Sequence, residues 1–185
     1  MILSDVDILE SLKRKEIIIE PLNTRLIGPC SVDLRLSDKF VVFKSKSLID
    51  PYDFHTLENA VEVIETRNRP FILMPKQFVL AYTLEKIAIS KSLAATLEGR
   101  SSIARLGIVV HAAGLVSPGS GMLVPKPLVL EVFSQSDTPV KLYPGMRIVQ
   151  MIFHRLTSPV SIGYDEDPRS SYSKKNVWIS RRAFP

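Results

Sequence analysis

Along most of the chain, hydrophobic and polar residues alternate with a period of two, which is the pattern of half-buried β-strands. The clearest case is SVDLRLS, residues 31–37, where Val32, Leu34 and Leu36 alternate with polar neighbours. Further short runs of this kind are KFVVFK, AVEVIE, PFILM, QFVLAYTLE, PLVLEVFS and RIVQMIF. Pro, Gly, Asn and Ser separate the runs and mark turns between them. The pattern predicts a mainly β protein, a sandwich or a barrel, with few helices.

A helical pattern occurs only near the N-terminus. Ser4 and Asp7 have the spacing of a capping box, in which each side chain bonds the other residue's backbone N–H. Ile8, Leu9 and Leu12 follow on one helical face. We therefore predict a short helix from about residue 5 to residue 14.

Domain organisation follows from length and from where the hydrophobic pattern thins. The chain has 185 residues, of which 45% are hydrophobic, enough for one domain over residues 1–185 with one sizeable core. After about Pro159 the apolar positions become sparse, and GYDEDPRSSYSKKN is mostly polar. We predict a mobile C-terminal tail or lid over roughly residues 164–185.

The amino-acid composition limits the cellular compartment and the kinds of partner that we expect. The single cysteine, Cys30, excludes an intramolecular disulfide and fits a reducing compartment. The opening stretch MILSDVDILESLKRKE is charged from Asp5 onward, so we expect no signal-peptide hydrophobic region there, and no apolar run is long enough to span a bilayer. The net charge of +5 is dispersed, without a basic stripe interleaved with aromatics. We expect a cytoplasmic protein with no membrane or nucleic-acid partner.

The first candidate site is the stretch EGRSSIARLG, residues 98–107. Gly99 permits a tight turn, and Ser101 and Ser102 are suited to the start of a short helix. Free N–H groups, two hydroxyls and the guanidinium of Arg100 would together bind phosphate. Arg105 lies five positions further on and points in another direction. The alternative is a capped surface helix with solvated arginines.

The second candidate is Glu131 in LVLEVF, residues 128–133. In a strand both faces of this stretch are apolar, so Glu131 would lie between Val129 and Phe133 on a largely buried surface. Burial raises the pKa of a carboxyl group unless a cation compensates, and a raised pKa suits a general acid or base. The alternative is a glutamate that reaches the rim and pairs with Arg105 or Arg147.

His111 is the third candidate, and it could be a ligand, a proton shuttle or a core histidine. The other two histidines, His55 and His154, are far from it in sequence. With one cysteine, the chain lacks the H-x-E and P-C-x-x-C signature of the zinc nucleobase deaminases. It also lacks a P-loop and a G-x-S-x-G elbow. No zinc site is expected.

Several motifs resemble, in order, those of the dCTP deaminase family of the trimeric dUTPase-like superfamily. They are EGRSSIARLG, the VVH segment, the strand LVLEV and YPGMRIVQMIF, together with the opening MILSDVDI, GPCSVDLRLSDKF and the late SPVSIGYDEDPRSSY. The resemblance covers almost the whole chain. It implies a distorted β-barrel or jelly roll of the dUTPase-like (β-clip) type. It also implies a homotrimer with active sites between subunits.

The resemblance further implies an enzyme, a hydrolase that deaminates dCTP to dUTP and ammonia without zinc, with Mg²⁺ bound through the substrate triphosphate. Glu131 would be the general base and acid, and Arg105 would hold Glu131 and the attacking water. The substrate-binding residues it implies are Arg100, Ser101, Ser102, His111, Ala113, Gly114, Tyr172, Lys174 and Lys175.

The stretch after His111 departs from the family pattern H-x-T-A-G-W-[IV]-D-x-G. The threonine is missing, Ser117 replaces the aspartate, and the turn before Glu131 is several residues longer. A serine cannot act as an anionic base at neutral pH. The sequence therefore favours dUTP as the reaction product, without its further hydrolysis. The alternatives are a bifunctional dCTP deaminase and dUTP diphosphatase, and a non-catalytic nucleotide-binding paralogue. Besides dCTP, dUTP or dTTP stays open as a ligand.

Overall fold

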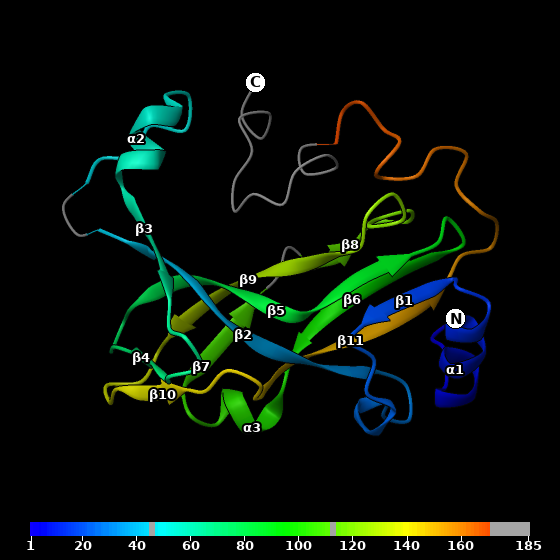
Figure 1. Cartoon of the computed structure of the whole chain (residues 1–185), viewed down its shortest axis with the longest axis horizontal. Helices are drawn as coiled ribbons and strands as arrows, with labels where there is room; N and C mark the ends of the chain where they lie inside the picture. Colours follow the sequence, from blue (N-terminus) through cyan, green and yellow to red (C-terminus); the bar gives the residue numbers. More distant parts are fainter. Residues whose placement is uncertain (45–46, 112–113, 171–185) are drawn as a thin grey trace.

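The computed structural model describes residues 1–44, 47–111 and 114–170 (Figure 1). Strands dominate this part of the chain, and the helices are short. In chain order the elements are α1 (Asp5–Lys13), β1 (Ile17–Glu20), the 3₁₀ turn η1 (Thr24–Leu26), β2 (Val32–Phe43), α2 (Phe54–Asn59), β3 (Val61–Glu65), β4 (Phe71–Leu73), β5 (Phe78–Ile89), β6 (Leu93–Gly99), α3 (Ser101–Ala104), β7 (Ile108–His111), β8 (Leu115–Val116), β9 (Lys126–Ser134), β10 (Val140–Leu142) and β11 (Arg147–Arg155). The predicted mainly β class is confirmed.

Within these residues, nine strands form one curled sheet in the order β7-β9-β5-β2-β11-β6-β8, with β1 added on β5 and β3 on β2. Strands β4 and β10 form a separate pair. The long strand β2 changes partners along its length, from β11 near Leu34 to β5 and β3 near Val41. The register with β5 shifts between Leu36 and Phe40, and such irregularities bend a sheet. Figure 1 shows this curvature, with α1 at one end of the sheet and α2 at the other.

The core lies inside the curl and is lined by alternate residues of the strands. Leu34 and Leu36 of β2 and Leu130 and Val132 of β9 are completely buried there. Phe40 stacks on Phe71 with ring centroids 4.3 Å apart, which joins β4 to the main sheet. The same alternation leaves the residues between these positions on the outer face of the sheet, where the site residues of β2 and β9 lie.

Helix α1 forms as the sequence predicts. The amide of Asp7 donates to Ser4 Oγ at 3.3 Å, and the amide of Ser4 donates to Asp7 Oδ2 at 3.2 Å, which completes a capping box. Hydrogen bonds from Ser4 also lower the pKa of Asp7. Ile8 is fully buried and anchors the helix to the sheet.

We expect the substitution Ser4→Ala to lower the free energy of unfolding by about 1 kcal/mol, the usual effect of losing an N-cap side chain. For a chain of this length the corresponding fall in Tm is about 2–4 °C. Thermal unfolding followed by circular dichroism measures it. Ser4→Thr keeps a capping hydroxyl and should lie close to the wild type. Equal losses in the two variants would contradict a capping role.

The first part of the expected tail packs against the body of the protein. The Tyr164 amide donates to Pro118 O at 2.8 Å, and Glu166 pairs with Lys91 at 3.0 Å. Asp165 is buried and accepts a hydrogen bond from the Leu123 amide at 3.2 Å. Mobility of the tail as a whole stays a prediction, because residues 171–185 lie outside the described part. No helix in the described part is both long and apolar enough to cross a membrane.

Candidate active site

Glu131 lies in the middle of β9, on the face of the strand that points away from the core. Its neighbours Leu130 and Val132 are fully buried on the other face. In the sheet, Glu131 is paired with Leu80 of β5 on one side and with His111 of β7 on the other. The carboxyl group therefore stands half-buried on a largely apolar surface, as the sequence predicted.

The surroundings of Glu131 favour its protonated form. Burial raises the pKa of Glu131, while its own backbone amide and the nearby His111 lower it to a smaller extent. Its Oε2 atom is buried and has no hydrogen-bond partner among the described residues. No ion pair joins Glu131 to Arg105 or Arg147 in this part of the chain, and Arg147 pairs with Asp33 instead. The structure thus supports the buried carboxyl rather than the rim ion pair.

The raised pKa predicts a pH-dependent cost in stability. A carboxyl whose folded-state pKa exceeds its unfolded value near 4.5 favours folding below that value, and this advantage is lost as pH rises through the folded-state pKa. We expect Glu131→Gln to raise Tm at pH 7.5 by about 2–4 °C, which corresponds to about 1 kcal/mol. The difference should vanish near pH 4. Thermal unfolding at both pH values tests this, and an equal shift at both would contradict the desolvation of Glu131.

The stretch EGRSSIARLG forms the end of β6 and the short helix α3. The N-cap is Arg100 rather than a serine, and its side chain makes no capping hydrogen bond. Ser101 and Ser102 occupy the first two helical positions with exposed side chains. Because the helix has only four residues, its dipole contributes little, and the hydroxyl and amide donors carry any anion binding here.

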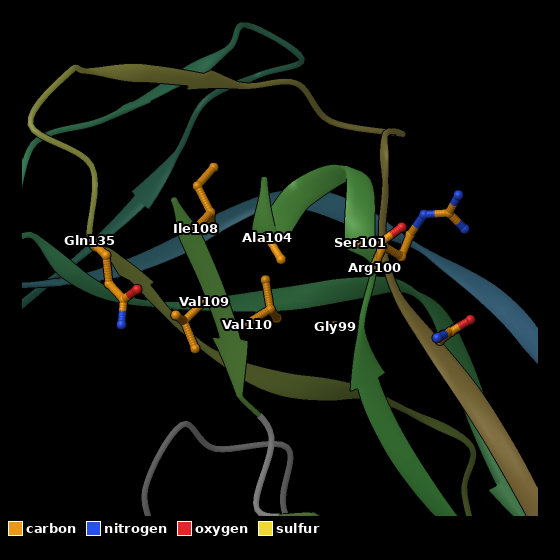
Figure 2. A pocket seen from close by; sticks show the side chains of 9 residues that line it. Gly99, Arg100, Ser101, Ala104, Ile108, Val109, Val110 and Gln135 are labelled. Atoms are coloured by element: carbon orange, nitrogen blue, oxygen red, sulfur yellow. The ribbon is translucent and has the colours of Figure 1, made fainter. Parts of the chain in front are cut away.

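A cavity of about 540 Å³ lies beside α3, between β6 and β7 (Figure 2). Its lining residues are Gly99, Arg100, Ser101, Ala104, Ile108, Val109, Val110, Gln135 and Gln150. In Figure 2 Arg100 and Gln135 lie at opposite ends of it, and the Arg100 side chain extends away from Val110. The cavity combines apolar walls with a cation and amide groups, a combination suited to a nucleotide.

The side chain of Arg100 forms an ion pair with a carboxylate of β2. Its Nη1 forms an ion pair with Asp33 Oδ1 of β2, and Arg147 Nη1 of β11 lies 3.2 Å from Asp33 Oδ2. Sequence reasoning placed Asp33 only as a polar position of a strand, and it did not name Gln135 or Gln150. A charged residue within the SVDLRLS alternation was the one available signal for Asp33.

Within one chain, the remaining predicted site residues do not all lie beside the cavity. Arg105 lies at the C-cap of α3 with an exposed side chain that makes no ion pair with a described residue. Glu131 does not line the cavity beside α3. Gly114 is exposed and has a φ of +66°, which favours glycine there. Ala113, Tyr172, Lys174 and Lys175 lie outside the described residues.

The loop that departs from the family pattern is tied to neighbouring segments. The Ser117 carbonyl accepts hydrogen bonds from the amide and hydroxyl of Ser120, at 3.1 and 2.6 Å. Lys126 Nζ lies 3.5 Å from Asp165 Oδ1. These contacts fix the approach of the chain to β9 and therefore to Glu131.

Comparisons with known proteins agree with this fold. A crystal structure of 2'-deoxycytidine 5'-triphosphate deaminase from Agrobacterium tumefaciens superimposes with a TM-score of 0.64 over 84% of this chain, at 20% identity. This chain spans about half, 48%, of the length of that protein. The chain therefore shares the fold of that deaminase.

Sequence comparison gives the family. The family model described as dCTP deaminase-like matches residues 2–156. A "dCTP deaminase, dUMP-forming" of Dictyoglomus turgidum is 42% identical over 179 residues, which cover 93% of this chain and 89% of the relative. One of the same name from Nanoarchaeum equitans is 40% identical over 197 residues, covering 97% and 96%. The chain belongs to the dCTP deaminase-like family.

Proposed function

We propose that the protein is an enzyme that hydrolytically deaminates dCTP. The observation that carries the proposal is Glu131, a half-buried carboxyl with a raised pKa, whose Oε2 has no hydrogen-bond partner among the described residues and which lies within the range matched by the family model. A carboxyl with its pKa moved toward neutrality can both accept and return a proton at physiological pH.

In the proposed reaction, the Glu131 carboxylate takes a proton from water as the water oxygen bonds to C4 of the cytosine ring. The carboxyl gives that proton to N3 of the ring, then takes the second proton from the new C4 hydroxyl and passes it to the 4-amino group, so that ammonia leaves as the C4–N bond breaks and the carbonyl of uracil forms. The apolar neighbours Leu80 and Val129 keep bulk water from the carboxyl, which preserves its poised pKa. Zinc is not required by this scheme.

The names of the relatives correct our expectation for the product. We infer dUMP rather than dUTP, since both relatives are named dUMP-forming. The balanced reaction is then dCTP and two waters to dUMP, ammonia and pyrophosphate. Ser117 cannot supply an anionic base for the second hydrolysis. That step therefore uses a group other than residue 117.

The triphosphate would lie beside α3, where Arg100 and Ser101 line the cavity. The described lining residues include no carboxylate, so a Mg²⁺ ion would come bound to the phosphates. Neutral oxygens of Ser101 and Gln150 fit such a hydrated ion. Magnesium would offset the phosphate charge, while the arginine fixes the orientation of the chain of phosphates.

We further propose a homotrimer with sites between subunits. Glu131 and the cavity beside α3 do not meet in one chain, which is expected if each site uses two copies. Large apolar side chains are also exposed in β8 and in the loop before β9, at Leu115, Leu123 and Val124. Light scattering of the purified protein would test the trimer directly.

The test of function is a turnover assay with dCTP and Mg²⁺ in which ammonia and pyrophosphate are measured together. Release of ammonia and pyrophosphate in equal amounts supports an enzyme that forms dUMP. Release of ammonia without pyrophosphate would show that the product is dUTP. A second assay with dUTP isolates the diphosphatase step. Binding of dCTP with no release of ammonia would overturn the proposal and leave a nucleotide-binding paralogue.

A further inference from the structure

We propose that Asp33 is a positioning residue that holds Arg100 in the orientation in which it binds the substrate triphosphate. The inference rests on the proposed function, because it assigns a role within the same site. Asp33 belongs to β2, 67 positions before Arg100, and lies near it because β2 and β6 both pair with β11 in the sheet.

Three strands and α3 converge at this carboxylate. Asp33 is paired in the sheet with Gln150 of β11, which lines the cavity. Gln150 is paired in turn with Glu98 of β6, one residue before Gly99, which ends the strand and leads directly to Arg100. The guanidinium of Arg100, a lining residue of the cavity, therefore forms its ion pair with Asp33.

The pair is sheltered enough to set the conformation of Arg100. The side chains of Arg100 and Asp33 are 20% and 15% exposed, whereas that of Arg147 is 54% exposed. Charge-assisted hydrogen bonds are stronger than neutral ones, and an ion pair sheltered from solvent is screened less than an exposed pair. An arginine fixed in this way loses less side-chain freedom when a phosphate binds, which increases affinity.

The charges around Asp33 show why one carboxylate is needed here. Arg35 is next to Arg147 in the sheet, but Arg35 is already bound by the buried Glu85, with Nε 2.6 Å from Oε1. Asp33 is thus the carboxylate shared by Arg100 and Arg147 in this cluster. Without it, the two guanidinium groups would repel each other, and Arg100 would leave the cavity wall.

The experiment compares Asp33→Asn with the matched control Asp38→Asn. Asp38 is in the same strand, and its carboxylate makes no hydrogen bond or ion pair with a described residue. For Asp33→Asn we expect KM for dCTP to rise about tenfold, with kcat within about threefold of the wild type, since the groups at the base are unchanged. The control should match the wild type in both.

Binding of inorganic tripolyphosphate, measured by calorimetry, tests the phosphate subsite without any turnover. Its dissociation constant should rise in Asp33→Asn in proportion to KM. Because this readout needs no reaction, failure of the proposed deamination would leave it interpretable. An unchanged constant would overturn the role of Asp33. A smaller dissociation constant would also overturn this role, because it would show that Asp33 only weakens the attraction between Arg100 and phosphate.

A second variant covers the case in which Asp33→Asn fails to fold. Adding Arg147→Gln removes the repulsion between the two arginines while still leaving Arg100 without its carboxylate. We expect the double variant to fold and to keep the raised KM. Recovery of wild-type KM in the double variant would show that Asp33 serves only to neutralise charge, and would overturn the inference.

Discussion

Replacing Glu131 with glutamine is expected to lower kcat for dCTP deamination by at least about 10³-fold. The amide has the same shape but can neither accept the proton of the attacking water nor return it to the leaving amine. General acid–base groups commonly contribute 10²- to 10⁴-fold, and here one group serves two proton transfers. Binding should change little, so KM is expected to stay within about threefold. Steady-state release of ammonia measures both constants.

The control for this prediction is Glu62→Gln, a change of the same kind at an exposed position of β3. It should keep wild-type kcat. Since Glu131→Gln is expected to be more stable than the wild type at pH 7.5, loss of activity cannot be attributed to unfolding. If Glu131→Gln kept more than about a tenth of wild-type kcat, another group would have to be the general base.

The fold could be predicted where one face of a strand is polar. Strand β2 alternates along most of its length, and its two halves were predicted as separate runs that the structure joins into one strand. Strand β6 was not predicted because its residues are buried on both faces, so LAATL shows no alternation. Strand β1 is too short, at four residues, for its apolar run to indicate a strand rather than a helix.

The site could be predicted where its chemistry is local. A glutamate between apolar neighbours in a strand indicates desolvation, and burial indeed raises the pKa of Glu131. The Asp33–Arg100 pair could not be found in this way, because it depends on the strand order, in which β11 lies between β2 and β6, and joins residues that are far apart in the sequence. Likewise Arg147 was considered as a partner for Glu131, but in the folded chain Arg147 forms an ion pair with Asp33.

The second large effect is expected at Gly121, in the loop that replaces the family's usual turn before β9. Its φ is +75°, and a Cβ there would lie 2.2 Å from the carbonyl oxygen of Ile87. Neither backbone can yield easily, because Ser120 O accepts a hydrogen bond from the Ile89 amide at 2.9 Å. We expect Gly121→Ala to cost about 3–5 kcal/mol, as overpacking and backbone strain combine. A fall in Tm on the order of 10 °C would measure it.

Gly145→Ala separates the clash from the backbone strain. Gly145 has a similar φ, +83°, but no atom lies within 4 Å of a Cβ built there. Only the left-handed strain of about 1 kcal/mol applies, so its Tm should fall by about 2–4 °C. Equal losses in the two variants would show that the loop moves away from Ile87 and does not fix the start of β9. The larger loss in Gly121→Ala, together with a lower kcat in the folded fraction, would show that the loop sets the position of Glu131.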